Sequence, residues 1–267
     1  ISRNRDSHFK FRSDSYFHYL SGFPEPDAVL FVVGGKTPFS VLFCQQKNKE
    51  KEIWNGFIYG PIEAKETFLI EEAHPLEKIN EIAIKLIANR KKIFTLSDNS
   101  PKQQKLINKW INFNKQQKRS GIRTPEMVVD LASILDPMRV VKSPYEIKLM
   151  QKSADIASEA HIQGMRNVLP GQHEYQVEGE ILNHFIQNGA GDPAYQSIVA
   201  GGKNACTLHY ITNNQKMVSG DLLLVDAGCE YELYASDITR TYPINGKFTP
   251  AQKNIYEMVL LAQKKAI

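Results

Sequence analysis

The sequence predicts an α/β domain followed by a separate α+β domain. In the first half, short runs of apolar and β-branched residues precede a segment with helical spacing, so strands and helices alternate. A helix-start signal then opens the second half at Ser143. Beyond it, two helical patterns come before a series of short strand-like runs separated by glycine-containing turns. We therefore place the domains at residues 1–140 and 141–267.

The first predicted element is a hairpin of buried strands. Residues 28–33 and 40–43 are apolar and β-branched, and Gly34-Gly35 and Thr37-Pro38 lie between them. The run 47–52 that follows mixes Lys with Glu, which is typical of a solvated loop or hairpin.

Two helices are predicted next in the first domain. The segment 76–89 has apolar residues at near-helical spacing, at Ile79, Ile82, Leu86 and Ile87. A surface helix covers the polar stretch 103–119 and ends at Gly121. Its apolar residues also recur at helical intervals: Leu106, Ile107, Trp110 and Ile111.

The second domain begins with a pair of helices. Ser143 stands at the N-cap position, Pro144 at the first helical position and Glu146 where a capping box requires it. A second helix begins near Glu174, and Gly189 supplies its left-handed stop. One apolar stripe runs along it: Val177, Ile181, Leu182, Phe185 and Ile186. We expect this pair to cover one face of a sheet.

Strands and a last helix complete the second domain. The strand-like runs are residues 197–200, 221–225 and 232–241. An amphipathic helix starts near Thr249-Pro250 and still shows helical spacing close to Ile267. Nothing marks a C-terminal cap, so we expect the second domain to be incomplete.

Composition narrows the class of protein. The 267 residues are 42% hydrophobic and 23% charged, with a net charge of +4 spread along the chain, which gives little support to nucleic-acid binding. The longest apolar run is strand-sized, so we expect a soluble protein without a membrane span. The three cysteines show no C-x-x-C spacing, which favours a reducing, cytoplasmic setting.

Two aspartates are the strongest candidates for chemistry. Asp226 closes the apolar run 222–225, where a carboxylate is costly to bury without a positive or hydrogen-bonding partner. Asp237 follows eleven positions later, a spacing that lets the two residues face each other across a hairpin. Two carboxylates that share a site repel unless a proton or a cation lies between them. A metal site follows if they meet; otherwise they are ordinary turn or edge residues.

Strand alternation adds one further residue to this site. It places Thr239 on the same face as Asp237, so Thr239 can contact the same ion. Oxygen ligands suit Mn, Mg, Co or Fe, and Zn once an imidazole joins.

His209 follows Gly201-Gly202 on a predicted strand end, and as a lone histidine it fits a core or surface role as well. The other six histidines show no H-E-x-x-H spacing, and we assign them no chemistry. Neither a phosphate-binding loop nor a G-x-S-x-G nucleophile elbow is present.

Several strings carry a family resemblance. Leu208–Tyr210, Val225–Gly228 and Ser236–Pro243 closely resemble segments of the Xaa-Pro aminopeptidases, of the prolidase and methionine-aminopeptidase superfamily. The likeness extends to residues 12–28 and 142–147, and so to nearly the whole chain. It implies a creatinase/aminopeptidase P-like α/β N-terminal domain followed by the first half of a "pita-bread" catalytic domain.

The resemblance also implies roles for single residues. Asp226 would bind one of two divalent ions and Asp237 would bridge both, with manganese expected first and cobalt, zinc or iron as alternatives. A metal-bound hydroxide would attack the peptide carbonyl beside His209, and Thr239 would support the ligands. Asp6 and Trp54 resemble residues that reach a neighbouring subunit's site in a homo-oligomer.

Hydrolysis of the N-terminal Xaa-Pro bond of peptides with proline in second position is thus the expected activity. An Xaa-Pro dipeptidase and a non-catalytic peptide-binding or scaffold protein are the alternatives. The family completes its site with a histidine and two glutamates from a later part of the domain. We therefore expect the 267 residues alone to be inactive.

Overall fold

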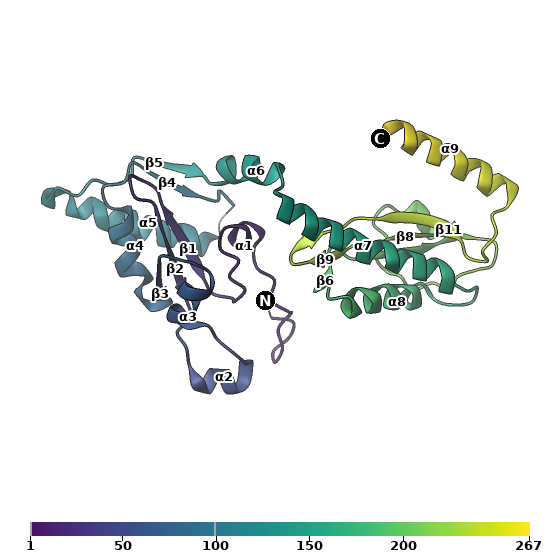
Figure 1. The fold of residues 1–267 in the computed structure, drawn as a ribbon, viewed down its shortest axis with the longest axis horizontal. Helices are drawn as coiled ribbons and strands as arrows, with labels where there is room; N and C mark the ends of the chain where they lie inside the picture. Colours follow the sequence, from purple (N-terminus) through teal and green to yellow (C-terminus); the bar gives the residue numbers. More distant parts are fainter. Residues whose placement is uncertain (1, 99) are drawn as a thin grey trace. The chain divides into compact units, whose positions relative to one another are not determined.

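The computed structural model describes residues 2–98 and 100–267, which form two compact units. The first unit ends at Val141, and the second runs from Lys142 to Ile267. Each has its own hydrophobic core, and Figure 1 shows the order of their helices and strands along the chain.

The first unit is built around a three-stranded sheet in the order β1-β2-β3. The predicted hairpin is present: β1 (Val29–Val33) and β2 (Phe39–Cys44) pair antiparallel, and β3 (Glu72–Pro75) lies parallel to β2. A separate parallel pair joins β4 (Lys92–Thr95) to β5 (Met127–Asp130).

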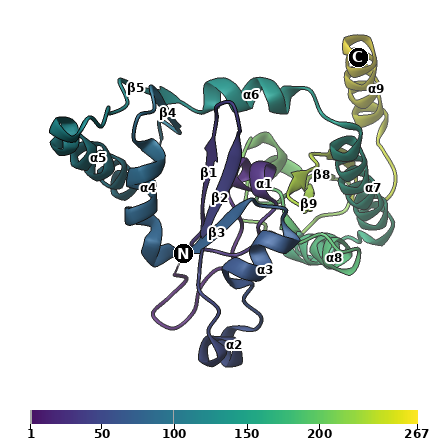
Figure 2. The ribbon, with the colours of Figure 1, turned by 60° about the vertical axis from the view of Figure 1, so that its left-hand side comes forward.

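Helices cover both faces of the main sheet. Successive side chains along β2 point to opposite faces, and because most of them are apolar, each face is packed against helices. Val41 and Phe43 pack with α4 (Ile79–Ile87) and α5 (Pro101–Gln116), which carry the predicted apolar residues. Leu42 packs on the opposite face, with residues of α1 (Ser15–Ser21) and α3 (Gly60–Thr67). Figure 2 shows the sheet between these two pairs of helices, so the first unit is a layered α/β fold.

Four shorter or peripheral elements complete the first unit: η1 (Leu76–Lys78), η2 (Gln117–Ser120), α2 (Lys49–Asn55) and α6 (Ala132–Val140). The helix α2 corrects the expected loop or hairpin at 47–52. Asn48 caps it by accepting hydrogen bonds from the backbone N–H groups of Glu50 and Lys51, a local signal that outweighs the high charge of the run.

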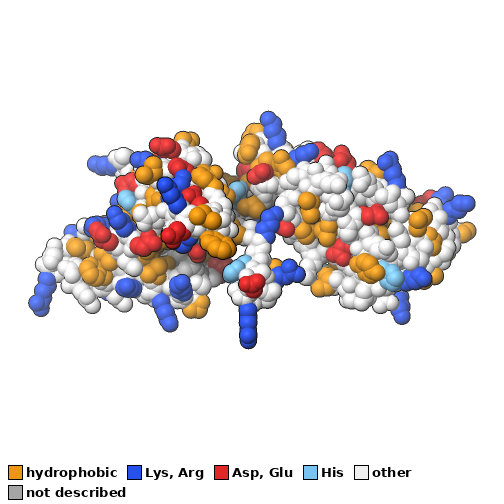
Figure 3. Space-filling view, turned by 90° about the horizontal axis from the view of Figure 1, so that it is seen from below, with side chains coloured by type: hydrophobic (Ala, Val, Ile, Leu, Met, Phe, Trp, Pro, Cys, Tyr) orange, Lys and Arg blue, Asp and Glu red, His pale blue; other side chains and the backbone are white. Residues whose placement is uncertain are grey.

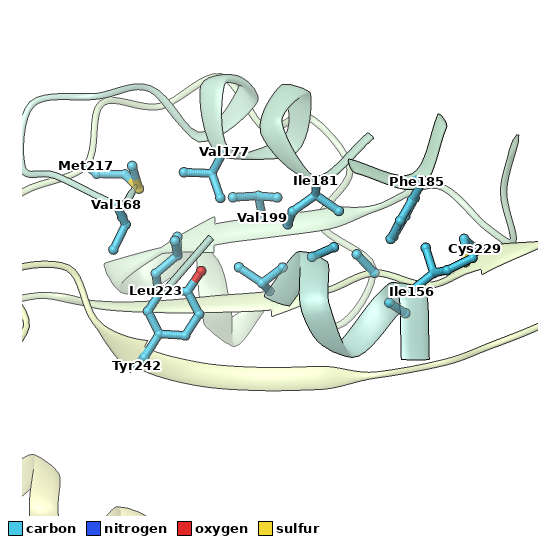
Figure 4. Close-up of a cluster of buried hydrophobic side chains, with 14 of the residues drawn as sticks. Ile156, Val168, Val177, Ile181, Phe185, Val199, Met217, Leu223, Cys229 and Tyr242 are labelled. Atoms are coloured by element: carbon cyan, nitrogen blue, oxygen red, sulfur yellow. The ribbon is translucent and has the colours of Figure 1, made fainter. Parts of the chain in front are cut away.

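The second unit opens with the two predicted helices, α7 (Pro144–Asn167) and α8 (Glu174–Gln187). The capping box between Ser143 and Glu146 is formed as the sequence indicates. One position of the predicted stripe is wrong, because Ile186 is 68% exposed at the last turn of α8. Figure 4 shows Val177, Ile181 and Phe185 pointing from α8 into the core.

Two three-stranded antiparallel sheets follow these helices. One has the order β11-β8-β7, formed by Thr239–Pro243, Leu222–Asp226 and Ile198–Gly201. Its core-facing residues include Val199, Leu223, Val225 and Tyr242.

The other sheet has the order β10-β9-β6, formed by Tyr234–Ala235, Cys229–Tyr231 and Asp192–Pro193. The strand predicted over 232–241 is therefore divided between two sheets. Glu232 and Leu233 form the two-residue turn between β9 and β10, both with positive φ.

The remaining elements are η3 (Gly202–Cys206) and α9 (Pro250–Ala266). The helix α9 begins with the predicted Thr249-Pro250 signal, in a capping box with Gln252, and extends away from the rest of its unit in Figure 1. None of its residues is buried.

The surface matches the mild composition. On the face shown in Figure 3, Lys and Arg side chains are interspersed with Asp and Glu over both units. None of the helices in the described part of the chain is both long and apolar enough to cross a membrane.

Candidate metal centre

Asp226 lies at the end of β8, on the face of the sheet that points away from the core. Along β8, Leu223 and Val225 are fully buried while Leu222, Leu224 and Asp226 are half-buried. Asp226 therefore ends an apolar strand while its carboxylate stays outside the core. The carboxylate thus avoids most of the free-energy cost of being buried.

Asp237 lies just before β11, in the neighbouring strand connection. The register pairs Thr239, not Asp237, with Asp226, and the backbone N–H of Ala227 donates to the carbonyl of Ile238. The two aspartates are thus diagonal neighbours and not the directly opposed pair that the spacing suggested. The position of the turn accounts for the difference. Tyr231 pairs with Tyr234 across the turn at Glu232 and Leu233, and the same register carried outward places Thr239 opposite Asp226.

Tyr195 joins the two aspartates. Its hydroxyl lies 2.5 Å from Oδ1 of Asp226 and 3.2 Å from Oδ1 of Asp237. The two carboxylate oxygens are therefore no farther apart than the sum of these distances. Burial, with the hydrogen bond to Asp226 next, holds the pKa of Tyr195 far above its ordinary value, so the hydroxyl remains a donor.

This convergence fits a divalent cation. Two carboxylates that point at one polar atom repel each other unless positive charge or donors lie between them, and their oxygens are ligands that hard and borderline metal ions accept. In residues 2–98 and 100–267, no group of three or more His, Cys, Asp or Glu side chains is placed to hold a metal ion. Among these residues, Asp226 and Asp237 therefore offer two carboxylates and no third side chain of these types beside them.

Gly228 lets the strand connections approach closely enough to form the site. A Cβ at Gly228 would overlap the carbonyl oxygen of Ser236, directly before Asp237. Only a residue without a side chain fits at this crossing. The Val-Asp-Ala-Gly string thus encodes both a carboxylate and the close backbone approach beside it.

His161 supports the strand end from the core side. It is buried in α7, and its Nε2 lies 3.0 Å from the carbonyl oxygen of Ala227. Because a carbonyl can only accept, Nε2 carries the proton and donates. Burial lowers the pKa of His161 below its ordinary value, so the ring is neutral near pH 7.

The other predicted site residues are placed separately. Thr239 is exposed opposite Asp226, and His209 is exposed in the irregular segment after η3, with no direct hydrogen bond to either aspartate among the described contacts. Asp6 and Trp54 lie in the first unit, where both are exposed, Trp54 by 85%.

Sequence reasoning missed Tyr195 and His161. Tyr195 is one of eleven tyrosines and lies far from the aspartates in sequence. His161 is one of the six histidines without a ligand spacing, to which the sequence assigned no chemistry. Both reach the site through tertiary packing, and no local spacing signal marks either of them.

Comparison with known families agrees with this arrangement. Residues 148–267 match the model described as metallopeptidase family M24, and residues 1–94 match the model of the aminopeptidase P N-terminal domain. The Xaa-Pro aminopeptidase of Haemophilus influenzae is 39% identical over 267 residues, which cover 99% of this chain and 59% of that protein.

Solved structures show the same relationship. Proline aminopeptidase P II from Yersinia pestis superposes with a TM-score of 0.96 at 39% identity, over 99% of this chain and 61% of that one. A zinc-substituted Escherichia coli aminopeptidase P in complex with product gives a TM-score of 0.96 at 36% identity, over the same shares. The chain therefore spans about three fifths of the length of these relatives.

Proposed function

Because the chain belongs to metallopeptidase family M24 and carries an aminopeptidase P N-terminal domain, we propose that a protein containing it hydrolyses N-terminal Xaa-Pro bonds. The main structural support for this proposal is that Asp226 and Asp237 both accept a hydrogen bond from the hydroxyl of Tyr195. The activity belongs to this chain together with the rest of an M24 domain. We assign residues 1–140 to the N-terminal domain and 141–267 to the catalytic domain.

Each site residue has a proposed task. Asp226 would bind one divalent ion and Asp237 would bridge two, with the hydroxyl of Tyr195 fixing the orientation of both carboxylates. The ions are manganese in this proposal, with cobalt, zinc or iron able to replace it. When bound, they activate water and stabilise the negative charge that develops on the carbonyl oxygen.

The substrate must be recognised without a backbone N–H at the cleaved bond, because an Xaa-Pro bond is a tertiary amide with a fixed proline φ. His209, exposed on its irregular segment, is free to hold the peptide beside the aspartates. Thr239 pairs with Asp226 in the sheet, and in this proposal it helps to hold the metal ligands in place.

We further propose a cytoplasmic homo-oligomer. In it, Asp6 and Trp54 of one subunit contact the site of another. Both residues are exposed in the first unit, Trp54 by 85%, so their side chains are accessible to a neighbouring subunit.

The test uses the complete protein and an Asp237→Ala variant. Metal content by mass spectrometry and release of the first residue from Ala-Pro-Ala should both be lost in the variant, because the bridging ligand is gone. Asp98→Ala, at an exposed aspartate of the first unit, is the matched control and should change neither. A wild-type protein that holds no metal and cleaves nothing would favour a non-catalytic scaffold, and cleavage of dipeptides alone would favour a prolidase.

A further inference from the structure

Glu174 is a fully buried carboxylate at the first residue of α8. Its side chain accepts four hydrogen bonds. Oε1 accepts from the backbone N–H of Gly201 at 2.8 Å and from Nδ2 of Asn204 at 2.9 Å. Oε2 accepts from the hydroxyl of Tyr210 at 2.8 Å and from the backbone N–H of Gln215 at 2.9 Å.

All four donors belong to one segment, residues 201–215, which carries His209. Strand β7 ends at Gly201, η3 ends at Cys206, and residues 207–215 contain neither helix nor strand. Donors on both sides of His209 are thus tied to the same carboxylate. The backbone N–H of Glu174 also donates to the carbonyl of Gln215, but no strand ladder runs through the stretch, so side-chain bonds supply much of its order.

A second anchor, Asn213, holds the segment between Tyr210 and Gln215. Asn213 adopts a positive φ and accepts from the backbone N–H of Val199 at 3.0 Å, while its own amide donates to the carbonyl of Ser197 at 2.8 Å. Asn213 therefore fastens the segment to β7, while Glu174 fastens it at both ends and at Tyr210, next to His209.

We propose that Glu174 is a positioning residue whose ionised carboxylate fixes segment 201–215 and so sets where His209 meets the substrate. This inference rests on the proposed function, in which His209 holds the peptide. The partners suit a carboxylate: three of the four are N–H groups, which can only donate, and both carboxylate oxygens can accept.

A Glu174→Gln variant tests the idea without changing the shape of the side chain. The amide nitrogen cannot accept, so it is best placed at the Oε2 position, where Tyr210 can rotate its hydroxyl to accept. The backbone N–H of Gln215 is then left without its partner. Glu257→Gln, at an exposed glutamate of α9, is the matched control.

The first readout is hydrogen–deuterium exchange measured on the wild-type chain and both variants. We expect amide exchange in residues 202–215 to rise by roughly tenfold or more in Glu174→Gln, with α7 unchanged. In the complete protein, kcat for Ala-Pro-Ala should fall by roughly tenfold or more while the metal content stays at the wild-type level.

Tyr210→Phe supplies the second variant, because it removes one donor and leaves the carboxylate in place. Its effect on kcat and that of Glu174→Gln should be less than additive in the double variant, since both act through one contact. A purely structural role would lower stability without this coupling.

Unchanged exchange in residues 202–215, or a uniform rise over the whole second unit, would overturn the positioning role. So would an unaltered kcat in the complete Glu174→Gln enzyme. If the complete wild-type protein cleaves no peptide, the proposed function fails by itself, and the exchange comparison then decides whether Glu174 orders the segment.

Discussion

Tyr195 donates a 2.5 Å hydrogen bond to Asp226 while its hydroxyl also lies within reach of Asp237. Replacing Tyr195 with Phe leaves two adjacent carboxylates without their shared donor. We expect the metal-free chain to lose about 1–3 kcal/mol of unfolding free energy at pH 7. Urea denaturation followed by circular dichroism measures this loss. Tyr175→Phe, at a half-exposed tyrosine of α8, should change stability by no more than ~0.5 kcal/mol. Equal stabilities of the wild type and Tyr195→Phe would contradict the idea that the Tyr195 hydroxyl stabilises the two carboxylates.

Gly228 passes so close to Ser236 that a methyl group cannot be accommodated. Gly228→Ala should therefore destabilise the second unit by about 3 kcal/mol or more, because strand β8 and the connection before β11 must separate. The control is Gly179→Ala in α8, where open space surrounds the added methyl group. That change should be neutral or stabilise the chain by ~0.5–1 kcal/mol. Thermal melts of both variants decide the matter, and similar melting temperatures would refute the crowding argument.

His161 should make stability depend on pH. Burial lowers its pKa in the folded chain, whereas the unfolded chain has the ordinary value of about 6.5. Below that pH the unfolded state takes up a proton that the folded state refuses, so stability falls as pH falls. The contribution to the slope is at most ~1.4 kcal/mol per pH unit.

The variant His161→Gln should therefore show a shallower loss of stability between pH 7.5 and pH 5.5 than the wild type. His209→Gln, at an exposed histidine, should follow the wild-type curve. Urea titrations at several pH values give these curves. Parallel wild-type and His161→Gln curves would mean that His161 titrates normally.

The 267-residue chain alone should release no residue from Ala-Pro-Ala, even with added manganese. In the proposed function Asp226 and Asp237 are two of the metal ligands, no third candidate joins them among the described residues, and two carboxylates hold a divalent ion weakly in water. A coupled assay for free alanine, with the complete protein as the positive control, measures the difference. Chelator-sensitive release by the short chain would show that a working site needs no further ligands.

Much of the fold was accessible from sequence because its signals are local. The capping box at Ser143 involves residues three positions apart and forms as predicted, and α9 begins at the predicted Thr249-Pro250. The hairpin of β1 and β2 also follows from adjacent runs and the turn between them. Ile186 was misplaced because helical spacing alone does not show where the packed partner of α8 ends.

The candidate site was accessible only in part. Asp226 stood out because a carboxylate ends an apolar strand, and Asp237 because of its spacing. Their diagonal placement was not foreseen, since it depends on the position of the turn at Glu232 and Leu233, which sets the register of the two strands. Tyr195 and Glu174 depend on contacts between residues more than twenty-five positions apart, where one sequence gives no spacing rule.

The hairpin that separates the two aspartates also has a practical use. The hydrogen bond from the backbone N–H of Ala227 to the carbonyl of Ile238 lies at the base of this hairpin, beside the two aspartates. Glu232 and Leu233 form the turn at its opposite end. Small insertions or a reporter label at the tip should therefore leave the paired aspartates where they are. An Asn-Gly pair in place of Glu232-Leu233 would relax the left-handed backbone and give a firmer attachment point for such a probe.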